Sequence, residues 1–570
     1  MVHSADLVGR AARGAPRISC ANFAAAPDWR LPMANRNILL IEPDYKNKYP
    51  PLGLMKIAQY HGPRGKNDRV RFVKGRDRSV LDQAWDRIYV TTLFSFEYPK
   101  IAETIDFALQ VANGQADKVF VGGIAASLMH QRFLDEGRWH GVRFIKGLLS
   151  GAPAQSLQLD EFAEELYADD LSGKPIEDLI PDYSILDQVE YRYPVRDAYF
   201  AYTSRGCIRK CHFCGVPKLE GMQRDTDSLT GVVRAIDELY GPRKDLILMD
   251  NNVVASARFK EIMAEIRDLG FTPGAKLQRP GQRVAVQRRV DFNQGVDARI
   301  LCKDPMYLRE LASIALRPLR IAFDHLGVRK PYEQAVRYAH EYGLHDLSNY
   351  MLYNFHDGPD DLFERMRLNV TLNEELGVRI WSFPMRFQPT DRPDRGHIGD
   401  KWTRFQLRSM QIVLQATHGV VSGEPTFFKH AFGDTFADYE RILALPHDFI
   451  FNREYYENGP GRPELDDYRV AFNRLTETDR AELLGLLSSR DPRHFHTLRD
   501  DADSDALRAV LPFYVPRPKE EWVGVWNSRR AEAAEEVNRG LAEDERVEDA
   551  GLDFEDTSET PDAVMPPMAA

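Results

Sequence analysis

The sequence predicts an α/β protein with a doubly wound domain, a second α/β core and a mainly helical C-terminal lobe. Two observations predict this class. Apolar strand patterns alternate with helical patterns from residue 37 to residue 390, which favours parallel sheets covered by helices. In addition, three of the five cysteines lie within eight residues directly after a predicted strand, where α/β enzymes place their chemistry.

The composition is that of a soluble globular protein, with 43% hydrophobic and 28% charged residues. No run of about 18 apolar residues occurs, so no membrane helix is expected. The net charge of −11 belongs to the C-terminus: residues 531–570 hold 13 of the 86 acidic and 2 of the 75 basic residues, which leaves 73 of each before them. No basic footprint therefore favours nucleic acid as a partner. Few cysteines and no signal sequence predict a cytoplasmic protein.

Changes in pattern divide the chain into six predicted segments. These are a disordered leader (1–36), a Rossmann-like domain (37–151), a linker (152–197), a core domain (198–390), a mainly helical domain (391–520) and an acidic, disordered tail (521–570). The tail is poor in large apolar residues, so it lacks the surface needed to form a core.

The first domain is predicted to contain five strands and two helices. A Pro-Pro pair opens the first helix, where a missing N–H costs nothing. The strands are 37–42, 69–74, 86–92, 118–123 and 142–147, and the helices are 50–59 and 101–111. Their alternation predicts a doubly wound parallel sheet.

The core domain is predicted to contain six strands separated by helices. The strands are 198–203, 245–250, 289–294, 319–324, 348–353 and 379–387, and the helices are 259–269, 304–314, 332–342 and 361–376. Polar residues recur where these strands end, which predicts a polar pocket at one rim of the sheet: Asp250, Asn251, Asn252, Asn293, Gln294, Asp297, Arg299, Asp324, His325, Asn354, Arg386 and Gln388. Two further helices, 402–416 and 479–487, fall in the C-terminal lobe.

The cysteines Cys207, Cys211 and Cys214 form a Cys-x3-Cys-x2-Cys pattern that indicates a soft metal centre. A structural zinc site requires four protein ligands, and a ferredoxin-type cluster requires a fourth cysteine in the motif. Neither requirement is met here, although a zinc knuckle remains the alternative. Cys302 is interpreted as a small hydrophobe, with a fourth ligand or a redox partner as the other options.

With Phe213 in the aromatic place, the motif Cys-x3-Cys-x-aromatic-Cys resembles that of the radical S-adenosylmethionine (radical SAM) superfamily. The resemblance implies that Cys207, Cys211 and Cys214 hold a 4Fe–4S cluster whose fourth iron binds S-adenosylmethionine. Reductive cleavage would then yield a 5′-deoxyadenosyl radical, with an electron donor such as flavodoxin or ferredoxin as partner. It also implies that the core is a partial (β/α)6, TIM-like barrel.

The same resemblance assigns roles to the rim residues. The end of the second strand would contact the amino group of S-adenosylmethionine, and here it reads Asp250-Asn251-Asn252 instead of the frequent Gly-Gly-Glu. The ribose and carboxylate would lie near Gln294, Asp297 and Arg299, and the adenine near Phe213. Asp324 and His325 are expected to bind substrate or handle protons.

The segment 37–151 resembles the cobalamin-binding domain that precedes many radical SAM cores, through Pro-Pro-Leu-Gly-Leu after the first strand and Gly-Gly after the fourth. Many such domains carry a cobalt-ligating histidine in the first loop. Here that loop, residues 44–53, contains none. Either cobalamin binds without a protein imidazole, or the domain no longer binds it. His61 and His130 are interpreted as structural.

The predicted function is that of a radical SAM enzyme that modifies an unknown small-molecule or peptide substrate, with methyl transfer if cobalamin binds. A methylthiotransferase would favour three more cysteines in the first domain and a basic RNA-binding tail, and both are absent from the sequence. The alternatives from other classes are a non-catalytic iron–sulfur redox sensor or cobalamin-responsive binding module, and a zinc-stabilised structural protein.

Overall fold

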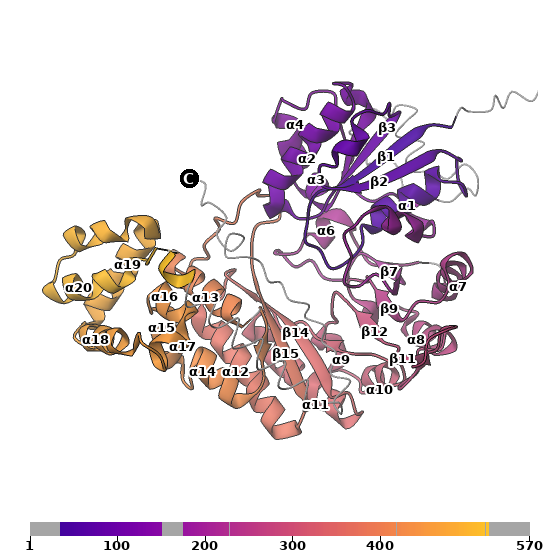
Figure 1. The fold of residues 1–570 in the computed structure, drawn as a ribbon. Coiled ribbons are helices and arrows are strands. Elements are labelled where there is room, and N and C mark those ends of the chain that lie inside the picture. The colour runs from indigo at the N-terminus through magenta and orange to yellow at the C-terminus, as the bar shows by residue number, and fades with distance from the viewer. Residues whose placement is uncertain (1–34, 151–174, 227, 418, 519, 524–570) are drawn as a thin grey trace, which may run out of the picture. The chain divides into compact units, whose positions relative to one another are not determined.

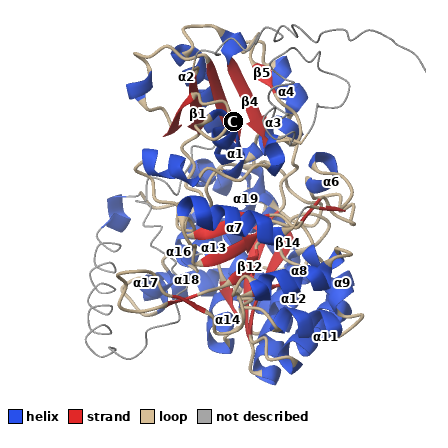
Figure 2. Ribbon diagram, turned by 90° about the vertical axis from the view of Figure 1, so that its right-hand side faces the viewer, coloured by secondary structure: helices blue, strands red, loops and turns tan. Residues whose placement is uncertain are grey.

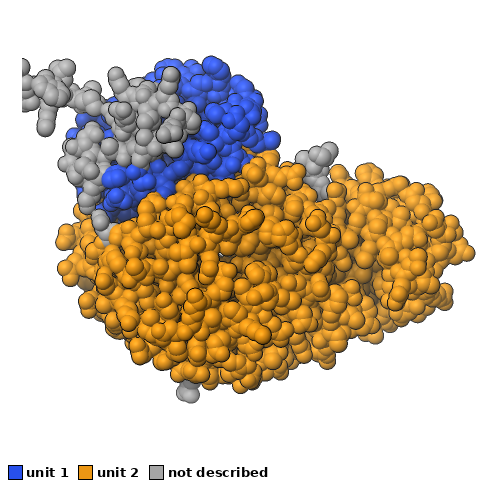
Figure 3. All heavy atoms as spheres, turned by 180° about the vertical axis from the view of Figure 1, so that it is seen from behind, with its two compact units in different colours: residues 1–93, 99–194 blue, residues 94–98, 195–570 orange. Residues whose placement is uncertain are grey.

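The computed structural model describes residues 35–150, 175–226, 228–417, 419–518 and 520–523. The described residues fall into two compact units, one within the ranges 1–93 and 99–194 and the other within the ranges 94–98 and 195–570 (Figure 3). The predicted leader up to residue 34, the linker up to residue 174 and the tail from residue 524 lie outside the described residues. Within the described ranges, no helix combines the length and apolarity that crossing a bilayer requires.

The first unit is built on a five-stranded, fully parallel sheet in the order β2-β1-β3-β4-β5 (Figure 1). Its strands are β1 Asn37–Glu42, β2 Arg69–Lys74, β3 Arg87–Thr92, β4 Val119–Gly123 and β5 Arg143–Phe144, and its helices include α1 Leu52–His61, α2 Tyr98–Val111, α3 Ile124–Leu128 and α4 His130–Asp135. This order confirms the predicted doubly wound sheet. It places the topological switch point, where such folds bind ligands, between β1 and β3.

His61 is a satisfied core histidine, as predicted. Its ring is fully buried, with Nδ1 2.8 Å from Asp68 Oδ2 and Nε2 2.9 Å from the Tyr89 hydroxyl. Burial lowers the pKa of His61, although the Asp68 carboxylate opposes this effect. Both ring nitrogens are used within the fold, so His61 is not available to bind cobalt.

The second unit contains the six predicted parallel strands in chain order, and Figure 2 labels β12 and β14 among them. These are β6 Ala198–Ala201, β9 Asp245–Leu248, β12 Val290–Phe292, β13 Leu319–Arg320, β14 Asp346–Tyr353 and β15 Arg379–Arg386. β6, β9 and β12 form one sheet, and β13, β14 and β15 form another, with two single bridges linking the β12 and β13 regions. The strand order is thereby confirmed, while closure into a partial barrel stays a prediction.

The helices between these strands are α6 Val216–Leu219, α7 Leu229–Tyr240, α8 Phe259–Asp268, α9 Ala298–Leu301, α10 Met306–Ala312, α11 Arg329–Glu341 and α12 Pro359–Leu376. Two small antiparallel pairs were not predicted: β7 Ser204–Arg205 with β8 Arg224–Asp225, and β10 Lys276–Leu277 with β11 Val286–Gln287. α7 was not predicted either. Its buried residues Leu229, Val233 and Ile236 nevertheless repeat with helical spacing.

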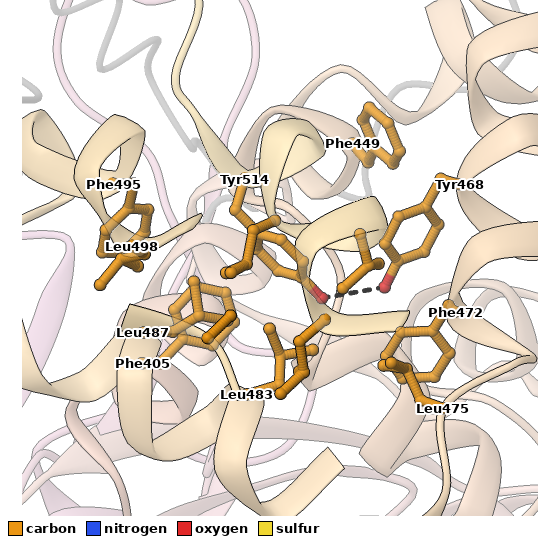
Figure 4. Packing of buried hydrophobic residues seen from close by; sticks show 14 of the residues in the cluster. Phe405, Phe449, Tyr468, Phe472, Leu475, Leu483, Leu487, Phe495, Leu498 and Tyr514 are labelled. Carbon is orange, nitrogen blue, oxygen red and sulfur yellow. Dashed lines mark hydrogen bonds between the residues drawn. The ribbon is translucent and has the colours of Figure 1, made fainter. Parts of the chain in front are cut away.

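The C-terminal lobe is helical, from α13 Arg404–Ala416 through α19 Glu477–Ser489 to α20 Asp505–Val510. It has its own apolar core, which Figure 4 shows around Phe405, Leu483 and Leu498. Inside this core the hydroxyls of Tyr468 and Tyr514 lie 3.1 Å apart and satisfy each other.

Candidate active site

The three cysteines lie on one loop, residues 206–223, that leaves the C-terminal end of β6. The short pair β7–β8 closes the base of this cysteine loop. Gly206 enters the loop at φ +77°, and a Cβ there would lie 2.4 Å from the carbonyl oxygen of Met222. The Cys207 N–H then donates to the Gly221 carbonyl at 3.2 Å. Only glycine permits this close crossing, which holds the two ends of the loop together.

The chemistry of the thiols fits an iron–sulfur cluster. Cys207, Cys211 and Cys214 are half-buried and free. The sulfur of Cys207 accepts the Arg209 N–H, and that of Cys214 accepts the Val216 N–H, each at 3.4 Å. Such hydrogen bonds stabilise thiolate ligands.

In the absence of a metal, burial raises the pKa of the Cys211 and Cys214 thiols, and the neighbouring cysteines and Asp324 raise it further. A bound cation would reverse this effect. Among the described residues, no three ligating side chains converge closely enough to hold a single metal ion.

Asp297 ties the cysteine loop to the end of β12. Its carboxylate accepts Arg209 Nε at 2.6 Å and Arg299 Nε at 2.8 Å, and it caps α9 by accepting the Arg299 N–H at 3.0 Å. Burial alone would raise the pKa of Asp297, but the hydrogen bonds from Arg299 and Arg209 hold it below its ordinary value. This predicted site residue therefore braces the loop between the first two cysteines. Gln294, predicted beside it, is exposed.

Asp250 lies at the end of β9, as predicted, and its carboxylate is engaged within the protein. It is buried and accepts the Thr203 N–H at 2.9 Å, the Thr203 hydroxyl at 2.6 Å and the Ser204 hydroxyl at 2.7 Å. Burial raises its pKa, and these hydrogen bonds oppose the rise. The neighbouring Asn251 donates to Glu220 at 2.9 Å. Both side chains position the chain around the cysteine loop.

Asn252 and Gln223 carry buried polar atoms that lack partners among the described residues. The two side chains lie side by side, because Gln223 Nε2 donates to the backbone carbonyl of Asn252 at 3.3 Å. Asn252 Nδ2 and Gln223 Oε1 have no hydrogen-bond partner. The pair thus offers one donor and one acceptor, which suits the carboxylate and ammonium groups of an amino acid such as the methionyl part of S-adenosylmethionine. Sequence reasoning missed Gln223, because it lies on the returning arm of the loop.

Asp324 follows β13 and contributes to the field around the cysteines. Burial raises its pKa, and the positive charges of Arg365, His325 and Arg299 oppose this. No other described residue forms a hydrogen bond with its carboxylate. The adjoining His325 is exposed. Of the two residues predicted to be catalytic, Asp324 is therefore half-buried, with a carboxylate that forms no hydrogen bond to another described residue, and His325 is exposed.

Arg365 of α12 was missed by sequence reasoning. It is fully buried and donates to the carbonyls of Phe323 at 3.0 Å and Leu352 at 2.8 Å, and to the carboxylates of Asp357 and Asp361. It thereby joins the ends of β13 and β14 to α12. A charge on the helix face that also carries Leu362 and Met366 was the available signal.

Phe213 extends from the cysteine loop to the ends of β14 and β15. Its ring meets that of Phe355 edge-on at 5.8 Å, and Phe355 in turn packs against Phe387 at 4.6 Å. The loop after the first core strand therefore contacts the loops after the fifth and sixth. Cys302 takes no part in this arrangement, since its sulfur lies 3.7 Å from the carbonyl of Arg299.

The C-terminal edge of the first unit's sheet is filled by a satisfied polar cluster. Glu42 of β1 accepts Lys74 Nζ at 2.8 Å, Asn47 Nδ2 at 2.9 Å and the Tyr193 hydroxyl. At the switch point, the hydroxyl of the buried Tyr45 accepts the Leu93 N–H at 3.4 Å. The loop after β1, residues 44–53, contains no histidine that could ligate cobalt. The feature that fits cobalamin is therefore the sheet topology.

The chain is similar to one curated protein over part of its length and to several solved structures. No family model matches the chain. A protein of Synechocystis sp. named "uncharacterized methyltransferase sll1242" is 25% identical over 232 residues, which cover 38% of this chain and 39% of that protein. The chain thus matches well under half the length of this relative.

Among solved structures, the chain is similar to the cobalamin-dependent S-adenosylmethionine radical enzyme OxsB with aqua-cobalamin and S-adenosylmethionine bound. The identity is 11%, the TM-score is 0.44, and the match covers 90% of this chain and 82% of OxsB. It is also similar to Streptococcus suis SuiB bound to its precursor peptide, with 11% identity, a TM-score of 0.26, and coverage of 39% of this chain and 46% of SuiB.

Proposed function

We propose that this protein is a radical SAM enzyme whose core forms a partial (β/α)6 barrel and whose cysteine loop carries a 4Fe–4S cluster. The single observation that carries the proposal is the loop itself: three free thiols between backbone-closed ends, two of them accepting N–H···S bonds. When bound, the cluster and S-adenosylmethionine supply a 5′-deoxyadenosyl radical that abstracts hydrogen from the substrate.

The residues of this chain have separable tasks in that reaction. Cys207, Cys211 and Cys214 would ligate iron, and the Arg209–Asp297 ion pair at 2.6 Å holds their loop in place. The free donor of Asn252 and the free acceptor of Gln223 would orient the amino-acid end of S-adenosylmethionine.

Asp324 would handle a proton near the cysteine loop, because its half-buried carboxylate forms no hydrogen bond with another described residue and burial raises its pKa. An electron donor such as flavodoxin or ferredoxin is the partner that this chemistry requires. The substrate in this proposal is a small molecule or a peptide.

The test is anaerobic reconstitution followed by assay for 5′-deoxyadenosine with dithionite and S-adenosylmethionine. The wild type is expected to hold about four irons and to release 5′-deoxyadenosine. A variant with Cys207, Cys211 and Cys214 changed to alanine should do neither, while Cys302→Ala, the matched control, should keep both. Zinc in place of iron would refute the proposal. A full cluster without cleavage, even with candidate substrates present, would favour a redox sensor.

Methyl transfer through cobalamin is the second candidate within this class. It is supported by the switch point between β1 and β3 in the first unit and by the name of the Synechocystis relative. Cobalamin would bind there without a protein imidazole. Reconstitution with hydroxocobalamin followed by desalting tests this candidate: retention of corrinoid at one equivalent supports it, and a colourless protein excludes it.

A further inference from the structure

Three buried polar atoms without partners belong to one group of side chains at the end of β15. Among the described residues, Arg386 Nε, Gln388 Oε1 and His397 Nε2 are each buried and unpaired. Arg386 Nη2 donates to the Arg395 carbonyl at 3.2 Å and to the His397 carbonyl at 3.0 Å, and Gln388 Nε2 donates to the same Arg395 carbonyl at 3.2 Å. Arg386 and Gln388 share the Arg395 carbonyl, and Arg386 also contacts the backbone carbonyl of His397. These three neighbouring residues are called here the β15-end cluster.

The β15-end cluster is connected to the cysteine loop by packed rings. Asn354, at the end of β14, donates to the carbonyls of Phe387 and His397 at 3.1 Å each. The ring of His397 meets Phe387 edge-on at 5.1 Å, and Phe387 contacts Phe355, which contacts Phe213. The unpaired atoms therefore lie on the same rim as the cysteines, a few side chains away from them.

The surroundings of this cluster carry excess positive charge. Burial lowers the pKa of Arg386; Tyr353 opposes this, and Arg395 and Arg408 lower it further. Burial likewise lowers the pKa of His397, with Arg392 and Arg386 adding to the effect, while the backbone carbonyl of Asn354 and the exposed Asp400 oppose it. No carboxylate of a described residue forms an ion pair with Arg386. A half-buried guanidinium without a counter-ion is suited to receive an anion.

The unpaired atoms also specify the hydrogen bonds that a ligand must make. Arg386 Nε is a donor, Gln388 Oε1 is an acceptor, and His397 Nε2 takes either role according to its tautomer. Flipping the Gln388 amide would set its oxygen against the Arg395 carbonyl, so the acceptor assignment is fixed by the contact. The complement is an anionic oxygen with a hydroxyl or an amine next to it.

We propose that Arg386, Gln388 and His397 form a subsite for an anionic group of the substrate, a carboxylate or a phosphate, that carries an adjacent hydrogen-bond donor. The inference rests on the proposed function in one respect: it takes the bound anionic group to be part of the enzyme's substrate. It adds a substrate class that neither the cysteine motif nor the comparisons supply. It also gives these three residues a role in specificity, because a neutral analogue would leave the guanidinium unpaired.

The experiment is calorimetric titration of the full chain, at constant ionic strength and without S-adenosylmethionine, with inorganic phosphate and with glycolate. Binding of phosphate alone points to a phosphate ester, and binding of glycolate alone points to a hydroxy acid. Arg386→Gln is expected to weaken binding at least tenfold. Arg404→Gln, which makes the same change at an exposed site on α13, should leave binding unchanged.

A second variant guards against misfolding of the first. Gln388→Glu keeps the size of the side chain and should also weaken anion binding at least tenfold, because it adds a negative charge to the cluster. Circular dichroism of each variant checks the fold. The proposal is overturned if the wild type binds neither anion, which would assign the unpaired atoms to water, or if folded Arg386→Gln and Gln388→Glu bind as the wild type does. Because this experiment measures anion binding, a protein that forms no 5′-deoxyadenosine could still confirm the anion subsite.

Discussion

The two units treat the polar groups at the C-terminal edges of their sheets in opposite ways. In the first unit, Glu42 of β1 and Lys74 of β2 are buried against each other, and Asn47 and Tyr193 complete their hydrogen bonds. In the second unit, Asn252, Gln223 and Arg386 keep buried atoms without partners. Both edges are where α/β folds bind ligands. Among the described residues, the Glu42–Lys74 cluster at the first edge is paired, whereas the second rim keeps unpaired donors and acceptors.

This difference separates structural polar clusters from candidate binding groups. A buried donor or acceptor without a partner costs folding free energy, so its presence calls for a ligand or a water as explanation. The Glu42–Lys74 pair needs no such explanation. The candidate binding groups are therefore those at the second unit's rim. Substitution at the first edge should mainly lower stability, and substitution at the second rim should mainly weaken ligand binding.

The largest expected loss of stability is at the satisfied edge. Lys74→Met leaves the Glu42 carboxylate buried without its counter-charge, so the free energy of unfolding should fall by about 3–5 kcal/mol. Urea denaturation measures it, with Lys48→Met, an exposed lysine of the neighbouring loop, as the control. A loss no larger than that of the control would show that this edge is solvated and that the contrast between the edges is false.

An unpaired buried atom away from any rim should act on stability alone, and His447 tests this. It stacks on Phe405 at 4.4 Å, and its Nε2 has no hydrogen-bond partner. Burial and the charge of Arg408 lower the pKa of His447 to about 3. Since the unfolded state binds this proton near pH 6.5 and the folded state does not, stability is lost as the pH falls below 6.5.

Between pH 6.5 and pH 5 this loss amounts to about 2 kcal/mol. His447→Leu should lack this part of the pH dependence, which urea denaturation at pH 7 and pH 5 will measure. An unchanged pH dependence in the variant would mean that His447 is protonated in the folded protein.

The smallest expected change in stability is at the unsatisfied rim. Gln223→Met removes an unpaired acceptor and two long hydrogen bonds, so the free energy of unfolding should change by less than about 1 kcal/mol. Binding of S-adenosylmethionine to the reconstituted protein should weaken about 10- to 100-fold, as equilibrium dialysis would show. Gln282→Met, at an exposed turn, is the control. Tight binding by Gln223→Met would remove this residue from the site.

Much of the fold follows from local patterns. β1 and β2 match their predicted bounds, because each is a short β-prone run that ends in turn-forming residues. β13 is Leu319–Arg320, shorter than the predicted strand 319–324. Beyond it, the Ile321 and Phe323 N–H groups still donate to carbonyls of β14, and the Ala322 N–H donates to the carbonyl of Val296. The chain there alternates between two neighbours, as a central strand does. α7 was not predicted, although its apolar residues repeat with clear helical spacing.

The site was less accessible to sequence reasoning. The spacing of the cysteines identified their loop, but the polar rim pattern could not show which side chains are already engaged. Asp250 and Asn252 are two residues apart; the first is saturated by Thr203 and Ser204, and the second has a free donor. That distinction depends on contacts over some 45 positions, from residue 203 or 204 to residue 250. His397 was missed for a similar reason, since it gains its place only through Arg386 and Asn354.

If the cysteine loop holds the proposed 4Fe–4S cluster, the closed base of that loop has a consequence for how long the cluster lasts. The crossing at Gly206 and the β7–β8 pair are made by backbone atoms, and none of them involves a thiol. Loss of iron to oxygen would therefore leave the ends of the loop anchored, and only the short arc that carries the sulfurs would have to be ordered again. We expect damage and repair of the cluster to proceed on a folded protein, so that iron delivery, and not refolding, sets how fast activity returns.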